Sequence, residues 1–253
     1  MRSLEGASVL ITGGGSGLGA GTARHFAERG AKVTISGRRP EKIRAVADAI
    51  GEHCQPVVSD VTRQADREEL VAAAVAHGDG LDVLVNNAGN MYRGPVTELE
   101  EEPLLGIFRS NVVGPMLLTG AAVPHLAERK GAVIFLGSVH TRRAFPGASP
   151  YAATKGAIEV LTKVLAAELG PQDIRVNCVV PGAVFTEINQ RAGLFDDDTA
   201  RQRLDSMAEM HALGRIGSEE EIAEAIAHLA CAEWTTGAVL DVDGGLGLGL
   251  TKA

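Results

Sequence analysis

A glycine-rich turn lies between an apolar segment and a helical segment near the start of this 253-residue chain. Residues 7–12 read Ala-Ser-Val-Leu-Ile-Thr, a short strand pattern, and residues 20–29 have a helical pattern. A second strand pattern, at residues 31–36, follows Gly30. Strand, glycine turn, helix and strand together make a βαβ unit, in which a crossover helix joins two parallel strands. The turn therefore favours an α/β fold built on a parallel sheet.

The same turn predicts a dinucleotide-binding site. Glycines let the backbone approach a pyrophosphate, which then lies at the positive N-terminal end of the following helix. The strand before the turn and the helix after it supply the structural context that such a glycine pattern needs. We assign this contact to Gly13, Gly15, Ser16, Gly17, Leu18 and Gly19.

The residues after the second strand bear on which dinucleotide is bound. An Asp or Glu there would hydrogen-bond the adenosine 2′-hydroxyl of NAD, but this chain has Gly37, Arg38 and Arg39, and its first acid is Glu41. The planar guanidinium group binds phosphate bidentately, so the two arginines favour the 2′-phosphate of NADP(H). NAD(H) is the alternative if both arginines face solvent at the start of a helix predicted over residues 40–50.

A phenol, an ammonium group and a hydroxyl are brought together later in the chain. Tyr151 and Lys155 are four residues apart in a helix predicted over residues 150–169, so they share one helix face. A nearby cation favours the phenolate and brings a tyrosine into the range of general acid/base chemistry. Ser138 ends a buried strand predicted over residues 131–137 and faces the binding crevice. These three groups can hold a carbonyl oxygen and move a proton onto it.

The motifs, in their order along the chain, resemble those of the classical short-chain dehydrogenases/reductases, and the resemblance covers nearly the whole chain. They are the turn at residues 12–19, the pair Asp60-Val61, the Asn-Asn-Ala-Gly run at 86–89, the Pro-Gly-Ala-Val-Phe-Thr run at 181–186, and residues 237–245. Asn111, Ser138, Tyr151 and Lys155 match the catalytic tetrad of that family.

The resemblance implies hydride transfer to or from a nicotinamide dinucleotide, with Tyr151 as the general acid/base. It implies that Lys155 lowers the Tyr151 pKa and holds the nicotinamide ribose, that Ser138 orients the substrate oxygen, and that Asn111 supports a water in a proton relay. No metal is expected, because Tyr151 and Ser138 already offer hydrogen bonds to the substrate oxygen. Further cofactor contacts are assigned to Asp60, Val61, Asn87, Ala88, Gly89, Tyr151, Lys155, Pro181, Gly182, Val184 and Thr186.

Strand and helix patterns alternate along the chain without a linker or repeat, which predicts one α/β domain over residues 1–253. We expect a Rossmann-type doubly wound sheet of seven parallel strands, with helices on both faces and a substrate lid at about 187–214. The strands are predicted at residues 7–12, 31–36, 55–58, 81–85, 131–137, 174–179 and 237–242. The glycine-rich ending at 244–250 is predicted to be a flexible tail, and the Asp run at 196–198 a solvated loop.

Composition argues against several classes of partner. The net charge of −8 and pI of 5.4, without a basic stripe, disfavour nucleic-acid binding. No stretch approaches the roughly 20 apolar residues of a membrane span, and the first strand begins too early for a signal peptide. Cys54, Cys178 and Cys231 are few and widely spaced, which is typical of reduced core residues in a cytoplasmic protein.

The substrate is less constrained than the reaction. Residues 138–140 and 181–189 are similar to the glucose dehydrogenase branch of the family, whereas much of the rest is similar to the 3-oxoacyl carrier-protein reductase branch. His140 either borders the pocket beside Ser138 or lies on the surface. The substrate pocket is assigned to Ser138, His140, Phe145 and Phe185.

We predict a homotetrameric, NADP(H)-linked oxidoreductase that acts on a small secondary alcohol or ketone. One alternative is an NAD-dependent sugar or cyclic-alcohol dehydrogenase, and another is a 3-oxoacyl carrier-protein reductase. The alternative outside enzymes is a dinucleotide-sensing module without turnover.

Overall fold

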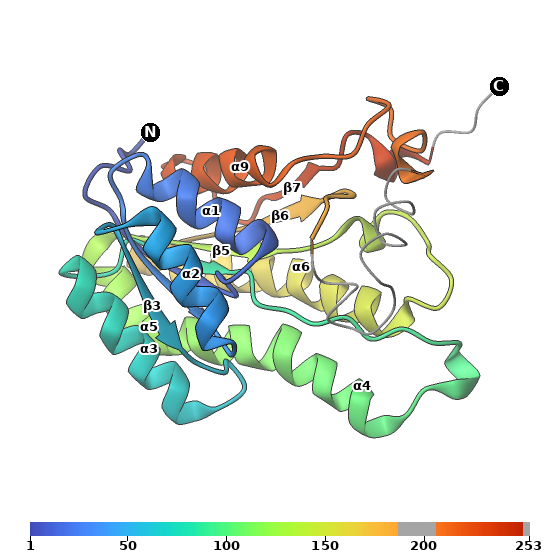
Figure 1. The fold of residues 1–253 in the computed structure, drawn as a ribbon, viewed down its shortest axis with the longest axis horizontal. Coiled ribbons are helices and arrows are strands. Elements are labelled where there is room, and N and C mark those ends of the chain that lie inside the picture. The colour runs from blue at the N-terminus through green and yellow to red at the C-terminus, as the bar shows by residue number, and fades with distance from the viewer. Residues whose placement is uncertain (187–205, 250–253) are drawn as a thin grey trace.

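Seven strands form one parallel sheet in the computed structural model, which describes residues 1–186 and 206–249. The spatial order is β3-β2-β1-β4-β5-β6-β7, so the chain starts in the middle of the sheet and winds first to one edge and then to the other (Figure 1). The strands are β1 Ser8–Thr12, β2 Lys32–Gly37, β3 Cys54–Val58, β4 Val83–Asn86, β5 Ala132–Leu136, β6 Arg175–Pro181 and β7 Val239–Val242.

All seven predicted strands are confirmed, with ends that lie within two residues of the predicted ones. The central strands β1, β4, β5 and β6 are buried along their whole length. A strand covered on both faces is rich in apolar residues, which explains why these segments were recognisable in the sequence. The predicted doubly wound fold is therefore correct.

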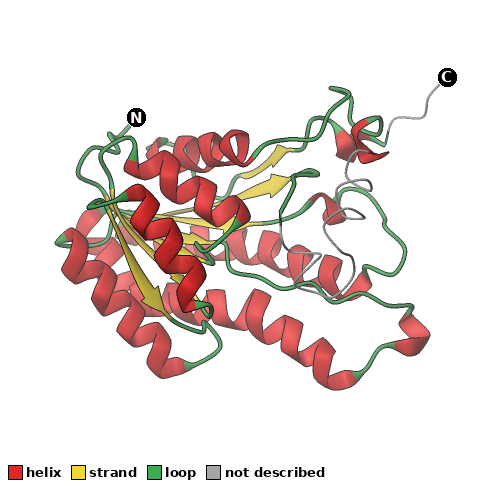
Figure 2. Ribbon diagram, in the orientation of Figure 1, coloured by secondary structure: helices red, strands yellow, loops and turns green. Residues whose placement is uncertain are grey.

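Helices cover both faces of the sheet, as Figure 2 shows. α1 Gly17–Ala27, α2 Pro40–Ile50 and α9 Glu219–Cys231 pack on the face that carries Val9 and Ile11. α3 Gln64–Gly78, α5 Gly114–Arg129 and α6 Ser149–Leu169 pack on the opposite face with Leu10. Neighbouring residues of β1 belong to different cores because successive strand side chains point to opposite faces.

One long helix is interrupted by a wider turn. α4 Glu101–Phe108 continues through the π-helical turn Arg109–Val113 into α5. The whole span of 29 residues is the one helix in the described part of the chain that is long and apolar enough to cross a membrane. Leu118, Ala122 and Leu126 of this helix are completely buried in the core beneath the sheet. We therefore interpret it as a core helix of the α/β fold.

The C-terminal glycine-rich segment departs from the prediction of a flexible tail. Residues 244–249 form a docked turn that contains the short helix Leu246–Leu248, and Leu246 is fully buried against Val139 and Ala183. Asp243 accepts hydrogen bonds from the backbone N–H groups of Gly245 and Gly247, at 2.8 and 2.7 Å. The prediction was wrong for these residues because one apolar side chain among glycines was enough to anchor them.

The predicted lid at 187–214 falls largely outside the described residues, and so does the whole Asp run at 196–198. Met207 and Met210, at the described end of that segment, pack against the small cluster formed by Val139, Ala183 and Leu246.

Candidate functional site

The carboxyl ends of β1, β4, β5 and β6 open onto one cavity. This is the edge of an α/β sheet where ligands bind, beside the point at which the strand order reverses. The cavity is lined by Gly13, Ser16, Gly17, Leu18, Asn87, Ala88, Gly89, Met91, Arg93, Leu136, Gly137, Ser138, Val139, His140, Phe145, Tyr151, Lys155, Pro181, Gly182, Ala183, Val184, Thr186 and Met207. Residues predicted to bind the cofactor and residues predicted to act on substrate therefore share one space.

The glycine turn is locked to the loop that follows β4. The Oγ1 of Thr12 accepts hydrogen bonds from the backbone N–H groups of Asn87 and Ala88, at 3.1 and 2.9 Å. The Asn87 amide donates to the Thr12 carbonyl at 2.8 Å. A Cβ atom at Gly19 would lie 2.4 Å from the carbonyl oxygen of Gly13, so a side chain at that position would disrupt the turn. These contacts hold the turn in the shape that lets a pyrophosphate approach the start of α1.

A second, smaller cavity adjoins the turn at the end of β2 and β3. It is lined in part by Ser36, Arg38, Ser59, Asp60 and Val61. Within the described part of the chain, the buried hydroxyls of Ser36 and Ser59 lack a hydrogen-bond partner. Buried polar groups are normally paired, so these two hydroxyls fit a site that receives a polar ligand. Cavity and orphan hydroxyls together fit the adenosine half of a dinucleotide.

Of the two arginines predicted to select the cofactor, Arg38 lines this second cavity and Arg39 contacts the glycine turn. Arg38 follows β2 directly, with its Nη1 4.0 Å from an Asp60 carboxylate oxygen, and its side chain is 61% exposed. Arg39 donates to the Ser16 hydroxyl at 3.3 Å. Both guanidinium groups are thus near the glycine turn, on the side where an adenosine ribose would lie.

Tyr151 and Lys155 are adjacent on α6, as their spacing predicted. The Lys155 Nζ lies 5.5 Å from the centre of the Tyr151 ring, and both residues are buried. Lys155 also donates to the Leu136 carbonyl of β5 at 2.8 Å, which fixes the ammonium group at the carboxyl end of that strand. The helix and the strand therefore present a phenol and a fixed cation to the same cavity.

Asn111 lies in the π-helical turn and is held on several sides. Its Nδ2 donates to the Asn90 carbonyl at 2.9 Å and to the Thr154 hydroxyl at 3.2 Å, and its Oδ1 accepts from the Asn90 N–H at 2.8 Å. A Cβ atom at Gly89 would lie 3.4 Å from this Oδ1 and 3.9 Å from the Lys155 Nζ. Asn111, Gly89 and Lys155 are therefore neighbours beneath the cavity. π-turns recur at functional sites in helices.

Ser138 and His140 lie together at the substrate side of the cavity. The Ser138 hydroxyl oxygen and the His140 Nδ1 are 3.0 Å apart. The His140 ring meets the Tyr151 ring edge to face at 5.1 Å and packs on Phe145 at 4.6 Å. Burial, followed by the charges of Arg93 and Lys155, lowers the pKa of His140 to about 4. His140 thus borders the pocket as a neutral imidazole at neutral pH, and does not lie on the surface.

Sequence comparison identifies the family. A family model described as Enoyl-(Acyl carrier protein) reductase matches residues 13–247. A glucose 1-dehydrogenase from Gluconobacter oxydans is 38% identical over 96% of this chain and 92% of its own. An L-fucose dehydrogenase from Bos taurus is 38% identical over 96% of this chain and 90% of its own. The chain belongs to the short-chain dehydrogenases/reductases.

Comparison with solved structures supports the same family. A short-chain dehydrogenase/reductase of unknown function from Caenorhabditis elegans, solved with cofactor, has a TM-score of 0.92 at 29% identity and covers 98% of this chain and 97% of its own. A 3-ketoacyl-(acyl-carrier-protein) reductase from Brucella melitensis, complexed with NADH, has a TM-score of 0.87 at 36% identity over 97% and 100% of the two chains. The protein is an NAD(P)-dependent oxidoreductase that acts on a small molecule.

Most of the predicted site residues of this short-chain dehydrogenase/reductase are gathered around the two cavities. Phe185, assigned to the substrate pocket, does not line either of them, and its side chain is 38% exposed. Three residues that sequence reasoning did not single out support the site: Thr12 holds the loop after β4, Thr154 holds Asn111, and Arg93 lines the cavity. Thr154 could have been found from the sequence, because it precedes Lys155 by one residue and follows Tyr151 by three.

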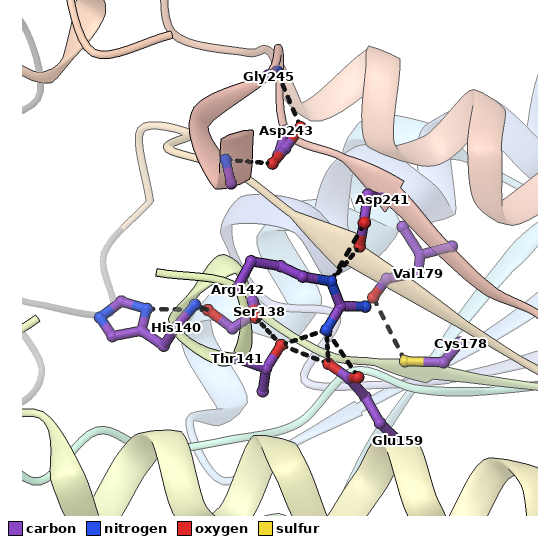
Figure 3. Close-up of polar contacts among 11 residues, drawn as sticks. Ser138, His140, Thr141, Arg142, Glu159, Cys178, Val179, Asp241, Asp243 and Gly245 are labelled. Atoms are coloured by element: carbon purple, nitrogen blue, oxygen red, sulfur yellow. Dashed lines mark hydrogen bonds and ion pairs between the residues drawn. The ribbon is translucent and has the colours of Figure 1, made fainter. Parts of the chain in front are cut away.

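An ion-pair cluster anchors the loop after Ser138, as Figure 3 shows. Arg142 contacts Glu159 of α6 at 2.8 Å and Asp241 of β7 at 2.9 Å. Thr141 donates from its hydroxyl to Glu159, and the same hydroxyl is 2.8 Å from the Ser138 carbonyl. The side chains of Arg142 and Glu159 are only 26% and 15% exposed. The cluster therefore ties the short helix Val139–Thr141 to both its neighbours in this short-chain dehydrogenase/reductase.

Proposed function

We propose that this enzyme interconverts a secondary alcohol and a ketone with NADP(H), and that Tyr151 is its general acid/base. The observation that carries the proposal is the meeting of the Ser138 hydroxyl, the Tyr151 phenol and the Lys155 ammonium in the cavity that also holds the glycine turn. A proton donor must lie within hydrogen-bond reach of the group it serves, and these three side chains surround one small space. Asn111 supports the same region from the π-turn.

The chain offers a continuous binding surface for the dinucleotide. Gly13, Gly15, Ser16, Gly17, Leu18 and Gly19 would hold the pyrophosphate at the start of α1. Asp60 and Val61 would border the adenine, while the loop at 87–89 and residues 181–186 would enclose the nicotinamide half, with Pro181, Gly182, Val184 and Thr186 in contact. When bound, the nicotinamide supplies or accepts the hydride.

The protein residues would handle the proton and the substrate oxygen. Tyr151 would give its phenolic proton to the carbonyl oxygen during reduction and take it back during alcohol oxidation. Lys155, held by the Leu136 carbonyl, would place its positive charge beside the phenol oxygen and bind ribose hydroxyls. Ser138 would donate a hydrogen bond to the oxygen that gains negative charge.

This function is tested by a turnover screen with purified protein. The ketone probes are phenanthrenequinone and ethyl acetoacetate with NADPH or NADH, and the alcohol probes are D-glucose and L-fucose with NADP⁺ or NAD⁺. We expect consumption of NADPH with at least one ketone probe. Faster turnover of the sugars would favour a second candidate, an NAD-linked sugar dehydrogenase, to which the names of the two 38% identical relatives point. Absence of turnover with every probe, in protein that binds NADPH, would contradict the proposed function for these substrate classes.

The preference for NADP(H) makes a prediction about Arg38. Replacement of Arg38 by Ala removes a guanidinium from the adenosine cavity, and charged hydrogen bonds contribute about 1.5–3 kcal/mol each. We expect the Kd for NADPH to rise by roughly 10- to 100-fold, whereas the Kd for NADH stays within about twofold. The fluorescence of the reduced cofactor measures both. Arg44→Ala, which removes an exposed arginine of the neighbouring helix α2, is the control. Equal loss for the two cofactors would overturn the choice of NADP(H).

We also propose that the protein is a homotetramer in the cytoplasm. α5, α6 and the π-turn carry a set of exposed apolar side chains that the described structure leaves uncovered. They are Val113, Met116, Leu117, Val160 and Val164, with exposed fractions of 46, 43, 48, 63 and 48%. Large exposed apolar groups on neighbouring elements are typical of protein interfaces. The buried thiols of Cys54, Cys178 and Cys231 suit a reducing compartment.

The tetramer predicts the effect of a charge on α6. Val160→Asp would place an unpaired carboxylate in the subunit contact, where its burial costs several kcal/mol. We expect the mass measured by light scattering after gel filtration to fall from that of a tetramer to that of a dimer or monomer. Val96→Asp, at another exposed valine (78%) outside this apolar set, should leave the mass unchanged. An unaltered mass for Val160→Asp would show that this face is not the contact.

A further inference from the structure

The contact between Ser138 and His140 limits where the proton of the Ser138 hydroxyl can point. The Ser138 oxygen lies 3.0 Å from the His140 Nδ1 and also accepts from the His140 backbone N–H at 3.4 Å. A serine hydroxyl has two acceptor positions and one proton. If both His140 groups donate, the acceptor positions are filled and the hydroxyl proton is left for a third partner. In the proposed function, that third partner would be the substrate oxygen.

The surroundings of His140 keep its ring neutral. Lys155 and Tyr151 face it from α6, Arg93 faces it from the loop after β4, and Phe145 packs on it from the loop before α6. The two acids that contact this loop, Glu159 and Asp241, are both engaged by Arg142. Burial and two nearby cations disfavour a third positive charge, and a neutral imidazole carries its proton on one nitrogen only.

We infer that His140 is a positioning residue whose Nδ1–H donates to the Ser138 oxygen and thereby directs the Ser138 proton at the substrate oxygen. The inference rests on the proposed function, because it assumes that Ser138 donates to that oxygen. The opposite tautomer would accept the serine proton and leave no donor for a carbonyl. The tautomer of His140 therefore decides whether Ser138 can assist reduction.

The backbone that carries both residues is fixed firmly enough for this role. The Ser138 carbonyl accepts a hydrogen bond from the Thr141 N–H at 3.0 Å, and the Thr141 hydroxyl is held by Glu159 of α6. Arg142 then ties the loop to α6 and β7, and Figure 3 shows the Ser138–His140 contact beside this ion-pair cluster. A positioning residue needs such support, because small displacements of a hydrogen-bonding group cost much of its effect.

The test compares four variants by kcat for the best ketone probe of the screen. His140→Phe keeps a ring to pack on Phe145 and Tyr151 but removes the nitrogen, and we expect kcat to fall about tenfold with the NADPH Kd unchanged. His140→Asn returns a donor close to the Nδ1 position, so kcat should recover by at least about threefold relative to Phe. In the Ser138→Ala background, the added His140→Phe change should have no further effect, since the two residues act through one hydroxyl.

Failure of the inference differs from failure of the proposed function. If Ser138→Ala retains wild-type kcat, the proposed role of Ser138 is wrong. If Ser138→Ala loses activity but His140→Phe does not, or if the two losses multiply in the double variant, His140 does not act through Ser138 and the inference is overturned.

A second measurement needs no substrate. Long-range ¹H–¹⁵N NMR of histidine-labelled protein, with His140→Phe to assign the signals, reports which ring nitrogen is protonated. We expect a protonated Nδ1 and a bare Nε2 for His140 at pH 7, with a shift toward the Nε2–H form in Ser138→Ala. A bare Nδ1 in the wild-type protein at pH 7 would overturn the inference even if no probe is turned over.

Discussion

Replacement of Tyr151 by Phe is expected to lower kcat by about 10²- to 10⁴-fold, the usual contribution of a positioned general acid or base. The change removes one oxygen atom and leaves the ring, which packs edge to face on His140 at 5.1 Å and lies near the Lys155 Nζ. Packing of the ring should therefore change little. The kcat for ketone reduction, measured with saturating NADPH and compared with the NADPH Kd, separates loss of chemistry from loss of binding.

The chain offers a matched control for this experiment in its other tyrosine. The Tyr92 hydroxyl accepts a hydrogen bond from the Glu100 backbone N–H at 2.9 Å, and Tyr92 lines neither of the two cavities of the site. Tyr92→Phe should keep kcat within about twofold, because only one exposed hydrogen bond is lost. Full activity in Tyr151→Phe would show that another group moves the proton.

Replacement of Gly19 by Ala is expected to weaken dinucleotide binding at least about tenfold and to lower stability by roughly 1–3 kcal/mol. The new methyl group would lie 2.4 Å from the Gly13 carbonyl oxygen and 2.5 Å from the Asn87 Nδ2, so the turn and the loop after β4 must separate. Those two segments form the pyrophosphate end of the cavity. NADPH titration and thermal unfolding of the same samples measure both effects.

A helical glycine without close neighbours supplies the control. A Cβ atom at Gly106 in α4 would meet no atom within 4 Å. Gly106→Ala should stabilise the protein by about 0.5–1 kcal/mol, because glycine loses more conformational freedom than alanine in a helix. If Gly19→Ala bound NADPH as tightly as Gly106→Ala does, the glycine turn would not be the pyrophosphate site.

The fold could be predicted because its signals are local. Strands β1, β4 and β5 consist mostly of consecutive apolar residues, and the glycine turn and the helix after it follow the first strand directly. The exact first and last residues of the strands could not be predicted, because a strand extends as far as a neighbouring strand pairs with it. The end of β6 is an example: Val180 and Pro181 extend the predicted strand because β7 pairs with them.

The site was predictable where its residues are near in sequence or end a strand, as for Tyr151, Lys155 and Ser138. Contacts between distant residues were not predictable. Asn111 in the π-turn is held by hydrogen bonds to the loop after β4 and to α6. Arg142 binds Asp241, which lies 99 residues further along the chain. For the same reason, the sequence did not show whether His140 borders the pocket or lies on the surface. Its ring is enclosed by residues such as Phe145 and lies near the charge of Arg93.

The order of these parts along the chain has a consequence for synthesis on the ribosome. The glycine turn and the loop after β4 leave the ribosome well before Asp241 and the docked turn after Asp243 do. Proteins begin to fold from the N-terminal side while translation continues. We expect a nascent chain to form its nucleotide-binding half first, while the loop of Ser138 and His140 lacks its anchor on β7. Premature termination before residue 241 would then yield a protein able to hold a dinucleotide but poorly able to use it.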